Sequence, residues 1–123
     1  MIGLGLDLCE IARIERTLQK GDAFLRRFFT EEERAYVAAK GNAGAASAAA
    51  MFAAKEAFLK AAGLGLGGGV ALNEIGVAHD DRGAPRYALL GAAVEKLAEL
   101  GAVRTHLTLT HESGMAGAVC VIE

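Results

Sequence analysis

The order of apolar and polar positions in the first half of the chain predicts one strand followed by three helices. Residues 2–8 place glycines on one face and leucines on the other, which suits a buried strand. A basic helix is expected from about residue 11 towards residue 20 or beyond. The Thr-Glu-Glu-Glu sequence at 30–33 fits a capping box, so a second helix is expected to begin there and to end near residue 41. The third helix covers 47–62.

The helix expected at 47–62 is apolar on almost every side, which is typical of a helix that packs against several neighbours. Alanine, the best helix former, dominates it. Ser47 is a candidate cap at its start, and Gly63 suits the position after its end. Three charged residues interrupt the apolar surface: Lys55, Glu56 and Lys60. The glycine-rich segment 63–69 follows directly.

In the second half the apolar pattern changes to a period of two, with one further helix. The expected elements are strands at 70–79 and 85–90, a helix at 91–100, and strands at 103–110 and 115–122. Turn sequences at 80–83 and 112–114 join the strands as two hairpins. Hairpins mixed with helices favour an α+β fold over a doubly wound parallel sheet, and we expect a single domain over residues 1–123.

The composition excludes several classes of protein. Apolar residues make up 53% of the 123 residues, which is not typical of a disordered chain, and the net charge of −2 argues against a general nucleic-acid binder. The apolar stretches are too short for a membrane helix, and no signal peptide is expected. Cys9 and Cys120 lie far apart without metal-ligand spacing, so we expect buried thiols in a reducing, cytoplasmic compartment.

One segment has a charge opposite to that of the whole chain. Between residues 11 and 27 there are five basic and two acidic residues, a local charge of +3. This segment is either an ordinary solvated helix face or a docking surface for an acidic partner, because complementary charges steer association and fix orientation.

Asp7 and Glu56 are the candidate metal ligands. Asp7 ends an apolar strand, and Glu56 lies in the apolar helix, where a carboxylate is costly unless a cation compensates for it. Two hard oxygen ligands suit Mg²⁺, which takes one or two carboxylates together with substrate phosphates. Lys60, one turn from Glu56, would then neutralise a phosphate. The alternative is a structural Glu56–Lys60 salt bridge. Zinc is not expected, because no cluster of His or Cys is present.

His111 and the glycine-rich segment have open roles. His111 is expected at a strand end on the same face as Leu107 and Leu109, as a structural imidazole, a phosphate contact or a proton-transfer group. His79 lies beside a turn and receives no functional role. The segment 63–69 follows a helix, whereas a dinucleotide fingerprint follows a strand. It is either a flexible connector or a place where the backbone approaches a ligand.

Five motifs occur in order along nearly the whole chain. They are Gly5-Leu6-Asp7 with Glu10 and Arg13-Ile14; Phe29-Thr30 with Glu33; Phe52-Ala53-Ala54-Lys55-Glu56-Ala57-Phe58 with Lys60, Gly63 and Gly65; Gly83 with Pro85; and Leu107-Thr108-Leu109-Thr110-His111. Together they resemble the motifs of the holo-acyl-carrier-protein synthases, a branch of the 4′-phosphopantetheinyl transferases. The third motif, with its K-E-A-x-x-K core, is the most diagnostic.

The resemblance implies the 4′-phosphopantetheinyl transferase fold, an antiparallel sheet packed around a central apolar helix. It also implies a Mg²⁺-dependent transferase of fatty acid biosynthesis. The donor is coenzyme A, the acceptor is a serine hydroxyl of an acyl carrier protein, and the by-product is adenosine 3′,5′-bisphosphate. Members of this branch are typically homotrimers with sites between neighbouring subunits.

The resemblance also implies roles for single residues. Asp7 and Glu56 would hold Mg²⁺ on the pyrophosphate, and Lys60 would face a phosphate. By the same matching, Gly63 and Gly65 let the backbone close on the ligand, His111 lines the pocket, and Arg13 lies on the surface that meets the carrier. From the chemistry of the transfer, we expect the base to be Glu56 or a metal-bound water that it orients, with Glu112 beside His111 as a weaker candidate.

The chain departs from the family pattern at three places. Met51 replaces a common Arg, Leu64 replaces a usual Thr, and residues 67–69 replace a stretch that often holds a basic residue. These changes remove polar groups near the expected coenzyme A site, so weaker donor affinity, a different donor or compensation from a neighbouring subunit are all open. The alternatives to the synthase are a non-catalytic module that binds carrier protein or coenzyme A, and a different Mg²⁺-dependent phosphotransfer enzyme on the same fold.

Overall fold

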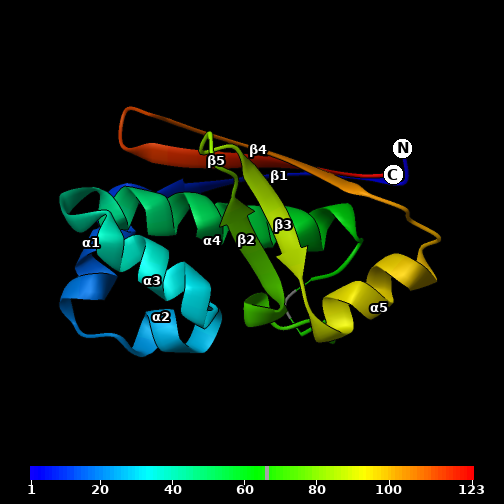
Figure 1. Cartoon of the computed structure of the whole chain (residues 1–123), viewed down its shortest axis with the longest axis horizontal. Coiled ribbons are helices and arrows are strands. Elements are labelled where there is room, and N and C mark those ends of the chain that lie inside the picture. Colours follow the sequence, from blue (N-terminus) through cyan, green and yellow to red (C-terminus); the bar gives the residue numbers. More distant parts are fainter. Residues whose placement is uncertain (66) are drawn as a thin grey trace.

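The central helix α4 lies along one face of a three-stranded antiparallel sheet in the order β1-β5-β4 (Figure 1). The coordinates are a computed structural model, and the structure describes residues 1–65 and 67–123. The elements of this core are α4 (Gly44–Ala61), β1 (Gly3–Glu10), β4 (Thr105–Glu112) and β5 (Met115–Ile122). A second antiparallel pair, β2 (Ile75–His79) and β3 (Pro85–Leu89), crosses α4 near β4.

Shorter helices lie towards the two ends of α4. They are α1 (Ile11–Gln19), α2 (Ala23–Phe28), α3 (Glu31–Ala39) and α5 (Gly91–Glu99), with the single 3-10 turns η1 (Gly41–Ala43) and η2 (Leu72–Glu74). Figure 1 shows α1, α2 and α3 grouped near one end of the molecule and α5 near the other. The expected α+β fold, with an antiparallel sheet against a central apolar helix, is confirmed. No helix in the described part of the chain is long and apolar enough to cross a membrane.

The two faces of β1 have different environments. Gly3 and Gly5 face α4 so closely that a Cβ atom at either position would collide with the carbonyl oxygen of Ala61 or Ala57. The opposite face carries leucines that are 59%, 58% and 61% exposed: Leu4, Leu6 and Leu8. The expectation of a buried strand is therefore right for the glycine face and wrong for the leucine face of this single chain.

The helix expected from residue 11 towards residue 20 is confirmed as α1. The structure adds a second helix in the basic segment, α2, because Gly21 takes a positive φ of 125° between them. The central helix begins at Gly44, three residues early, so Ser47 lies inside it and is not its cap. Gly63 does follow its end as expected, with a φ of 72°.

The capping box at the start of α3 is confirmed. The backbone N–H of Glu33 donates to Thr30 Oγ1 at 3.1 Å, and the backbone N–H of Thr30 donates to Glu33 Oε1 at 2.8 Å. The Glu33 side chain is also buried, which the local capping pattern does not predict.

The strand expected at 70–79 is shorter than predicted. Residues 72–74 form η2, and β2 begins only at Ile75, because the Glu74 side chain bonds backwards to the N–H of Ala71 and forwards to that of Ala92. The two hairpins form as expected, with Gly83 and Gly114 in left-handed conformations in their turns.

Candidate active site

Asp7 and Lys60 meet at the boundary between β1 and α4. The Lys60 ammonium donates to Asp7 Oδ1 at 2.9 Å and to the carbonyl oxygen of Leu6 at 2.9 Å. The Asp7 side chain is 19% exposed, whereas that of Lys60 is 54% exposed. Lys60 therefore forms an ion pair with Asp7 and not the structural salt bridge with Glu56 that the helical spacing offered as an alternative.

Glu56 belongs to the same cluster. Burial raises the pKa of Glu56, and the nearby Asp7 carboxylate raises this pKa further. Lys60 and Arg13 act in the opposite direction and lower it. The structure thus brings together two carboxylates that are 49 positions apart in the sequence.

The cluster fits a magnesium ion that is shared with a substrate. In residues 1–65 and 67–123 no group of three or more His, Cys, Asp or Glu side chains is arranged to hold a metal alone. Mg²⁺ needs fewer protein ligands, because substrate phosphates and waters complete its shell. Asp7 and Glu56 supply two carboxylates whose mutual repulsion a divalent cation would relieve. The Lys60 ammonium already provides a cation at this place.

Arg13 lies beside this cluster. Its Nη2 atom is 4.0 Å from the Sγ atom of Cys9, which follows Asp7 on the same face of β1. Burial raises the pKa of the Cys9 thiol, and Arg13 lowers it. The predicted carrier-facing arginine therefore lies in the first half of α1, next to the carboxylates.

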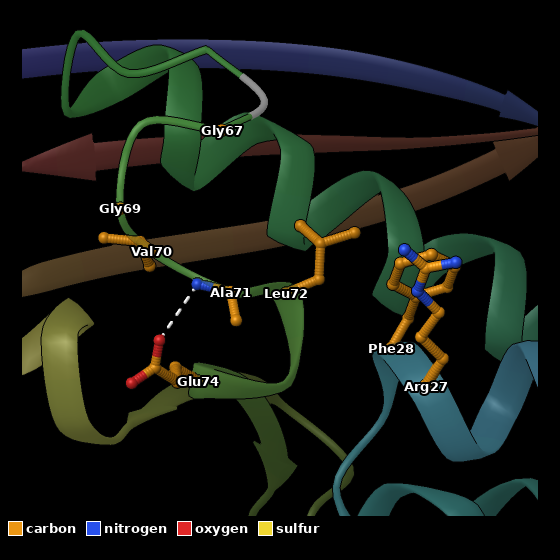
Figure 2. Close-up of a pocket in the computed structure, with 8 residues that line it drawn as sticks. All are labelled: Arg27, Phe28, Gly67, Gly69, Val70, Ala71, Leu72 and Glu74. Atoms are coloured by element: carbon orange, nitrogen blue, oxygen red, sulfur yellow. Dashed lines mark hydrogen bonds between the residues drawn. The ribbon is translucent and has the colours of Figure 1, made fainter.

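The glycine-rich segment borders a cavity of about 480 Å³ (Figure 2). Arg27 and Phe28 from α2 form one wall, with the guanidinium 5.1 Å from the centre of the Phe28 ring, and Leu72 lies between them and the segment. A Cβ atom at Gly63 or Gly65 would meet open space. The segment includes Leu66, which lies outside the described residues. Its predicted approach to a ligand remains a prediction.

His111 lines a different cavity, of about 400 Å³. Tyr36 and His79 stack there with ring centres 4.1 Å apart, and the Lys40 ammonium lies 4.9 Å from the Tyr36 ring centre. Burial lowers the pKa of His79, and Lys40 lowers it further. The structure does not join His111 to the Asp7 cluster, because β5 separates β1 from β4 and α4 residues also line the His111 cavity.

Sequence reasoning missed the surroundings of both cavities. His79 received no role because its place beside a turn says nothing about Tyr36, 43 positions earlier. In the sequence, Arg27 is only one of the five positive charges of the segment 11–27. The positive charge of that segment was the available signal, but its contact with the glycine-rich segment depends on tertiary packing.

A family model described as the 4′-phosphopantetheinyl transferase superfamily matches residues 3–118, and the chain belongs to this superfamily.

Known relatives show which branch of the superfamily this chain resembles. The holo-[acyl-carrier-protein] synthase of Treponema denticola is 46% identical over 123 residues, which cover 100% of this chain and 98% of the relative. The crystal structure of the same enzyme from Neisseria meningitidis has a TM-score of 0.89 at 35% identity and covers 100% of this chain and 98% of that one. That from Helicobacter pylori, in complex with coenzyme A, has a TM-score of 0.84 at 30% identity, with 98% and 99% covered. The resemblance to the holo-acyl-carrier-protein synthases is confirmed.

Proposed function

We propose that this chain transfers the 4′-phosphopantetheine group of coenzyme A to a serine hydroxyl of an apo-acyl carrier protein, with Mg²⁺, and releases adenosine 3′,5′-bisphosphate. The observation that carries the proposal is the joint presence of Asp7, Glu56 and Lys60 at one site in a member of this superfamily. The reaction is a phosphoryl-type transfer, in which positioning and charge stabilisation do most of the work.

Asp7 and Glu56 would hold the magnesium ion against the donor pyrophosphate. The ion supplies positive charge that stabilises the negative charge on the pyrophosphate oxygens during transfer. Asp7 enters from β1 and Glu56 from α4, so the position of β1 on α4 sets the distance between them.

Lys60 would change its partner when the donor binds. Its ammonium pairs with Asp7, and its side chain is half exposed, so it can turn towards a phosphate when the donor arrives. Asp7 would then be free to hold the metal, and the Lys60 ammonium would pair with the phosphate instead.

Glu56 is our candidate for the group that accepts the serine proton. A carboxylate with a raised pKa is a better proton acceptor near neutral pH than an ordinary one, and burial and Asp7 both raise the pKa of Glu56. The serine oxygen forms a bond to the β-phosphorus as the bond to the leaving bisphosphate oxygen breaks.

The basic segment 11–27 would receive the carrier. Arg13 lies next to the carboxylate cluster, so a carrier that docks there places its serine close to the donor. The net positive charge of this segment suits a carrier with an acidic surface, because complementary charges steer association.

The assembly that we propose is a homotrimer with sites shared between subunits. Two observations support shared sites: the exposed leucine face of β1, and the separation of the His111 cavity from the Asp7 cluster within one chain. His111 of one copy would then serve, with Lys40, the donor held by the carboxylates of another. The number three comes from the family resemblance.

A non-catalytic binding module is the second candidate, because Met51 and residues 67–69 lack the cations of the family pattern. The intact Asp7–Glu56–Lys60 cluster argues against it, since a binding module has no use for a carboxylate pair on a metal.

The buried free thiols of Cys9 and Cys120 support a cytoplasmic location.

Mass spectrometry of an apo-acyl carrier protein tests the proposal directly. Incubation with the protein, coenzyme A and Mg²⁺ should add the mass of one phosphopantetheine, and chelation of the metal should prevent the addition. The Asp7→Ala variant is the control, with circular dichroism to show that it is folded. An unmodified carrier after incubation with the wild-type protein would overturn the function.

A further inference from the structure

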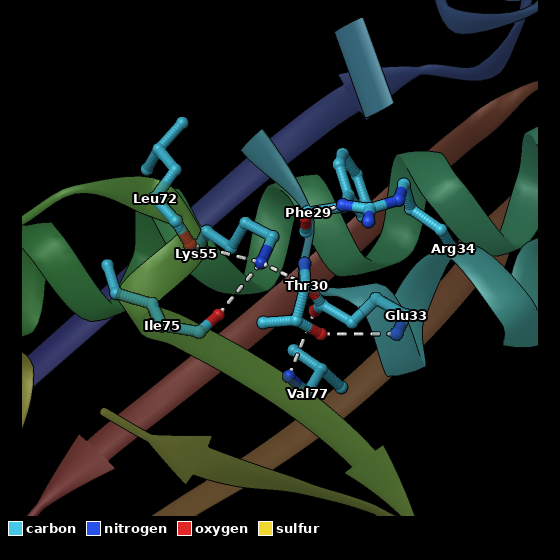
Figure 3. Close-up of polar contacts among 8 residues, drawn as sticks. All are labelled: Phe29, Thr30, Glu33, Arg34, Lys55, Leu72, Ile75 and Val77. Atoms are coloured by element: carbon cyan, nitrogen blue, oxygen red, sulfur yellow. Dashed lines mark hydrogen bonds and ion pairs between the residues drawn. The ribbon is translucent and has the colours of Figure 1, made fainter. Parts of the chain in front are cut away.

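A buried ion pair joins α3 to α4 (Figure 3). The side chains of Lys55 and Glu33 are 0% and 1% exposed. The Lys55 ammonium donates to Glu33 Oε1 at 2.7 Å and to the carbonyl oxygens of Leu72 at 3.1 Å and Ile75 at 2.9 Å. These three bonds use all three protons of the ammonium group.

Glu33 is equally well satisfied. Its Oε1 atom also accepts from the backbone N–H of Thr30 at 2.8 Å, and its Oε2 atom accepts from that of Val77 at 2.9 Å. The pair therefore connects the first turn of α3, the middle of α4, the turn η2 and the strand β2 at a single point (Figure 3).

Stability alone is a weak reason for such a pair. Removing two charges from water costs several kcal/mol each, and apolar replacements for a buried pair are often neutral or stabilising. Burial lowers the pKa of Lys55, and Glu33 raises it, so the partner compensates for part of that cost. A pair of this kind fixes geometry, because a carboxylate and two carbonyl groups must all meet one ammonium.

The geometry that it fixes includes the direction of Glu56. Lys55 and Glu56 are consecutive on α4, so their side chains leave the helix about 100° apart. Lys55 points to α3 and β2, whereas Glu56 shares a helix face with Lys60, whose ammonium contacts Asp7 Oδ1 at 2.9 Å. Seven of the twelve buried α4 residues are alanines, so the large buried side chains that resist rotation about the helix axis are only Met51, Phe58 and Leu59, besides Lys55.

A small rotation of α4 would matter at the active site. At a radius of about 6 Å from the helix axis, a rotation of about 20° moves a carboxylate by about 2 Å. A shift of about 1 Å in a catalytic group can reduce a rate by about 100-fold. Anchoring Lys55 therefore limits how far the Glu56 carboxylate can move from Asp7.

The same ammonium holds the segment that follows the glycines. The Leu72 and Ile75 carbonyl groups lie at the start of η2 and the start of β2, and Leu72 also lines the cavity beside the glycine-rich segment (Figure 2). Lys55 thus sets the position of one wall of that cavity relative to α4.

We infer that Lys55 and Glu33 are positioning residues of the transfer reaction: their buried pair fixes the rotation of α4 that aims Glu56 at Asp7 and anchors the wall of the cavity beside the glycine-rich segment. The inference rests on the proposed function. Neither residue touches the substrate in this scheme, and both act through Glu56 and Leu72.

The test separates positioning from folding with a double variant. Lys55→Met alone leaves the Glu33 charge buried without its partner and should lower the thermal midpoint strongly. Glu33→Gln combined with Lys55→Met removes both charges, so the protein should fold with a midpoint near that of the wild type. Arg34→Met is the matched control, because Arg34 donates to the Phe29 carbonyl oxygen from the same helix but does not contact α4 through this bond.

The readouts are metal binding and the separate kinetic constants. Mn²⁺ binding to the complex with coenzyme A, followed by electron paramagnetic resonance, should weaken about tenfold in the double variant, the effect expected when a partner that orients a metal ligand is lost. The kcat of transfer should fall by a similar factor, with the KM for apo-carrier unchanged. Arg34→Met should match the wild type in metal binding.

Each outcome decides a specific claim. A folded double variant with wild-type Mn²⁺ affinity and kcat overturns the inference while the proposed function stands. A wild-type protein that neither transfers nor binds Mn²⁺ with coenzyme A overturns both. If the double variant does not fold, Glu33→Gln alone, which keeps one acceptor for Lys55, is measured in the same way, and unchanged metal affinity there overturns the inference.

Discussion

The surroundings of Glu56 make its negative charge costly for stability, and the same surroundings suit it to bind a cation and accept a proton. Burial and the neighbouring Asp7 raise its pKa, so the charged form is disfavoured as long as no cation is bound. The same surroundings attract a divalent cation and make the carboxylate a better base. The cluster is therefore expected to trade stability for function.

Glu56→Gln should abolish transfer and raise stability at neutral pH. The pKa of Glu56 is higher in the folded state than its ordinary value of 4.5, so the folded protein binds the proton more tightly than the unfolded chain does. The stability of the protein therefore falls as the pH rises from 4.5 through the raised pKa. Glutamine has no such titration. Thermal unfolding of both proteins from acid to neutral pH measures the difference. A lower midpoint for the variant at neutral pH would contradict the prediction.

Lys60→Met should tighten metal binding in the absence of coenzyme A. The Lys60 ammonium competes for Asp7 Oδ1, and the loss of a half-exposed ion pair should change Mn²⁺ affinity by about two- to fivefold. Transfer should become slower, because the donor phosphate loses a cation. Lys96→Met on α5 is the control. Weaker Mn²⁺ binding in Lys60→Met would show that the ammonium does not compete with the metal.

At the scale of elements, the contact between β1 and α4 forms part of the core and also positions the residues of the site. Gly3 and Gly5 allow the strand to approach the helix backbone, and the next inward residue on the strand is Asp7. The packing that buries alanines on α4 also sets the distance between Asp7 and Glu56.

Gly5→Ala should destabilise the protein by about 3 kcal/mol, because its Cβ atom would meet the carbonyl oxygen of Ala57 and push β1 away from α4. Chemical unfolding measures this loss. Gly65→Ala is the matched control for stability, because its Cβ atom would enter open space and should leave the free energy of unfolding almost unchanged. Equal unfolding free energies for the two variants would refute the close-packing argument.

The helices α1 and α2 present the basic segment. Arg13→Glu should weaken carrier docking much more than coenzyme A binding, mainly through a slower association rate, and the difference should shrink at high salt. Surface plasmon resonance with apo-carrier at low and high salt is the measurement. Arg82→Glu, in the β2–β3 turn, is the control. Equal carrier affinity of Arg13→Glu and the wild type at low salt would count against the docking surface.

At the scale of the whole molecule, one face of the sheet is apolar and exposed. Leu4, Leu6 and Leu8 lie in a row along β1, and Val119 and Val121 on the adjacent β5 are only half-buried. A face of this kind is typical of an interface between protein chains.

We expect light scattering at micromolar concentration to give the mass of a trimer. Leu6→Asp should dissociate it and reduce transfer, because a shared site loses one of its contributing subunits. Val94→Asp, at an apolar position of α5 that is 50% exposed, is the control and should leave the mass unchanged. A stable wild-type monomer that transfers at full rate would overturn the shared-site proposal.

The sequence by itself determined the local structure and the identity of the reacting groups. The capping box at Thr30, the left-handed Gly63 after the central helix and the two hairpin turns were predictable, because each depends on residues close in sequence. The carboxylates and the lysine of the cluster were predictable because charged groups in apolar segments need a compensating partner.

The tertiary structure alone decided which partners these groups have. Lys60 pairs with Asp7 across 53 positions, and Lys55 pairs with Glu33 across 22, although helical spacing offered Glu56 as a nearer partner for Lys60. The same packing separates His111 from the carboxylate cluster and leaves the leucines of β1 exposed. Local patterns do not encode these outcomes, because they depend on how closely β1 approaches α4 and on the rotation of α4 about its axis.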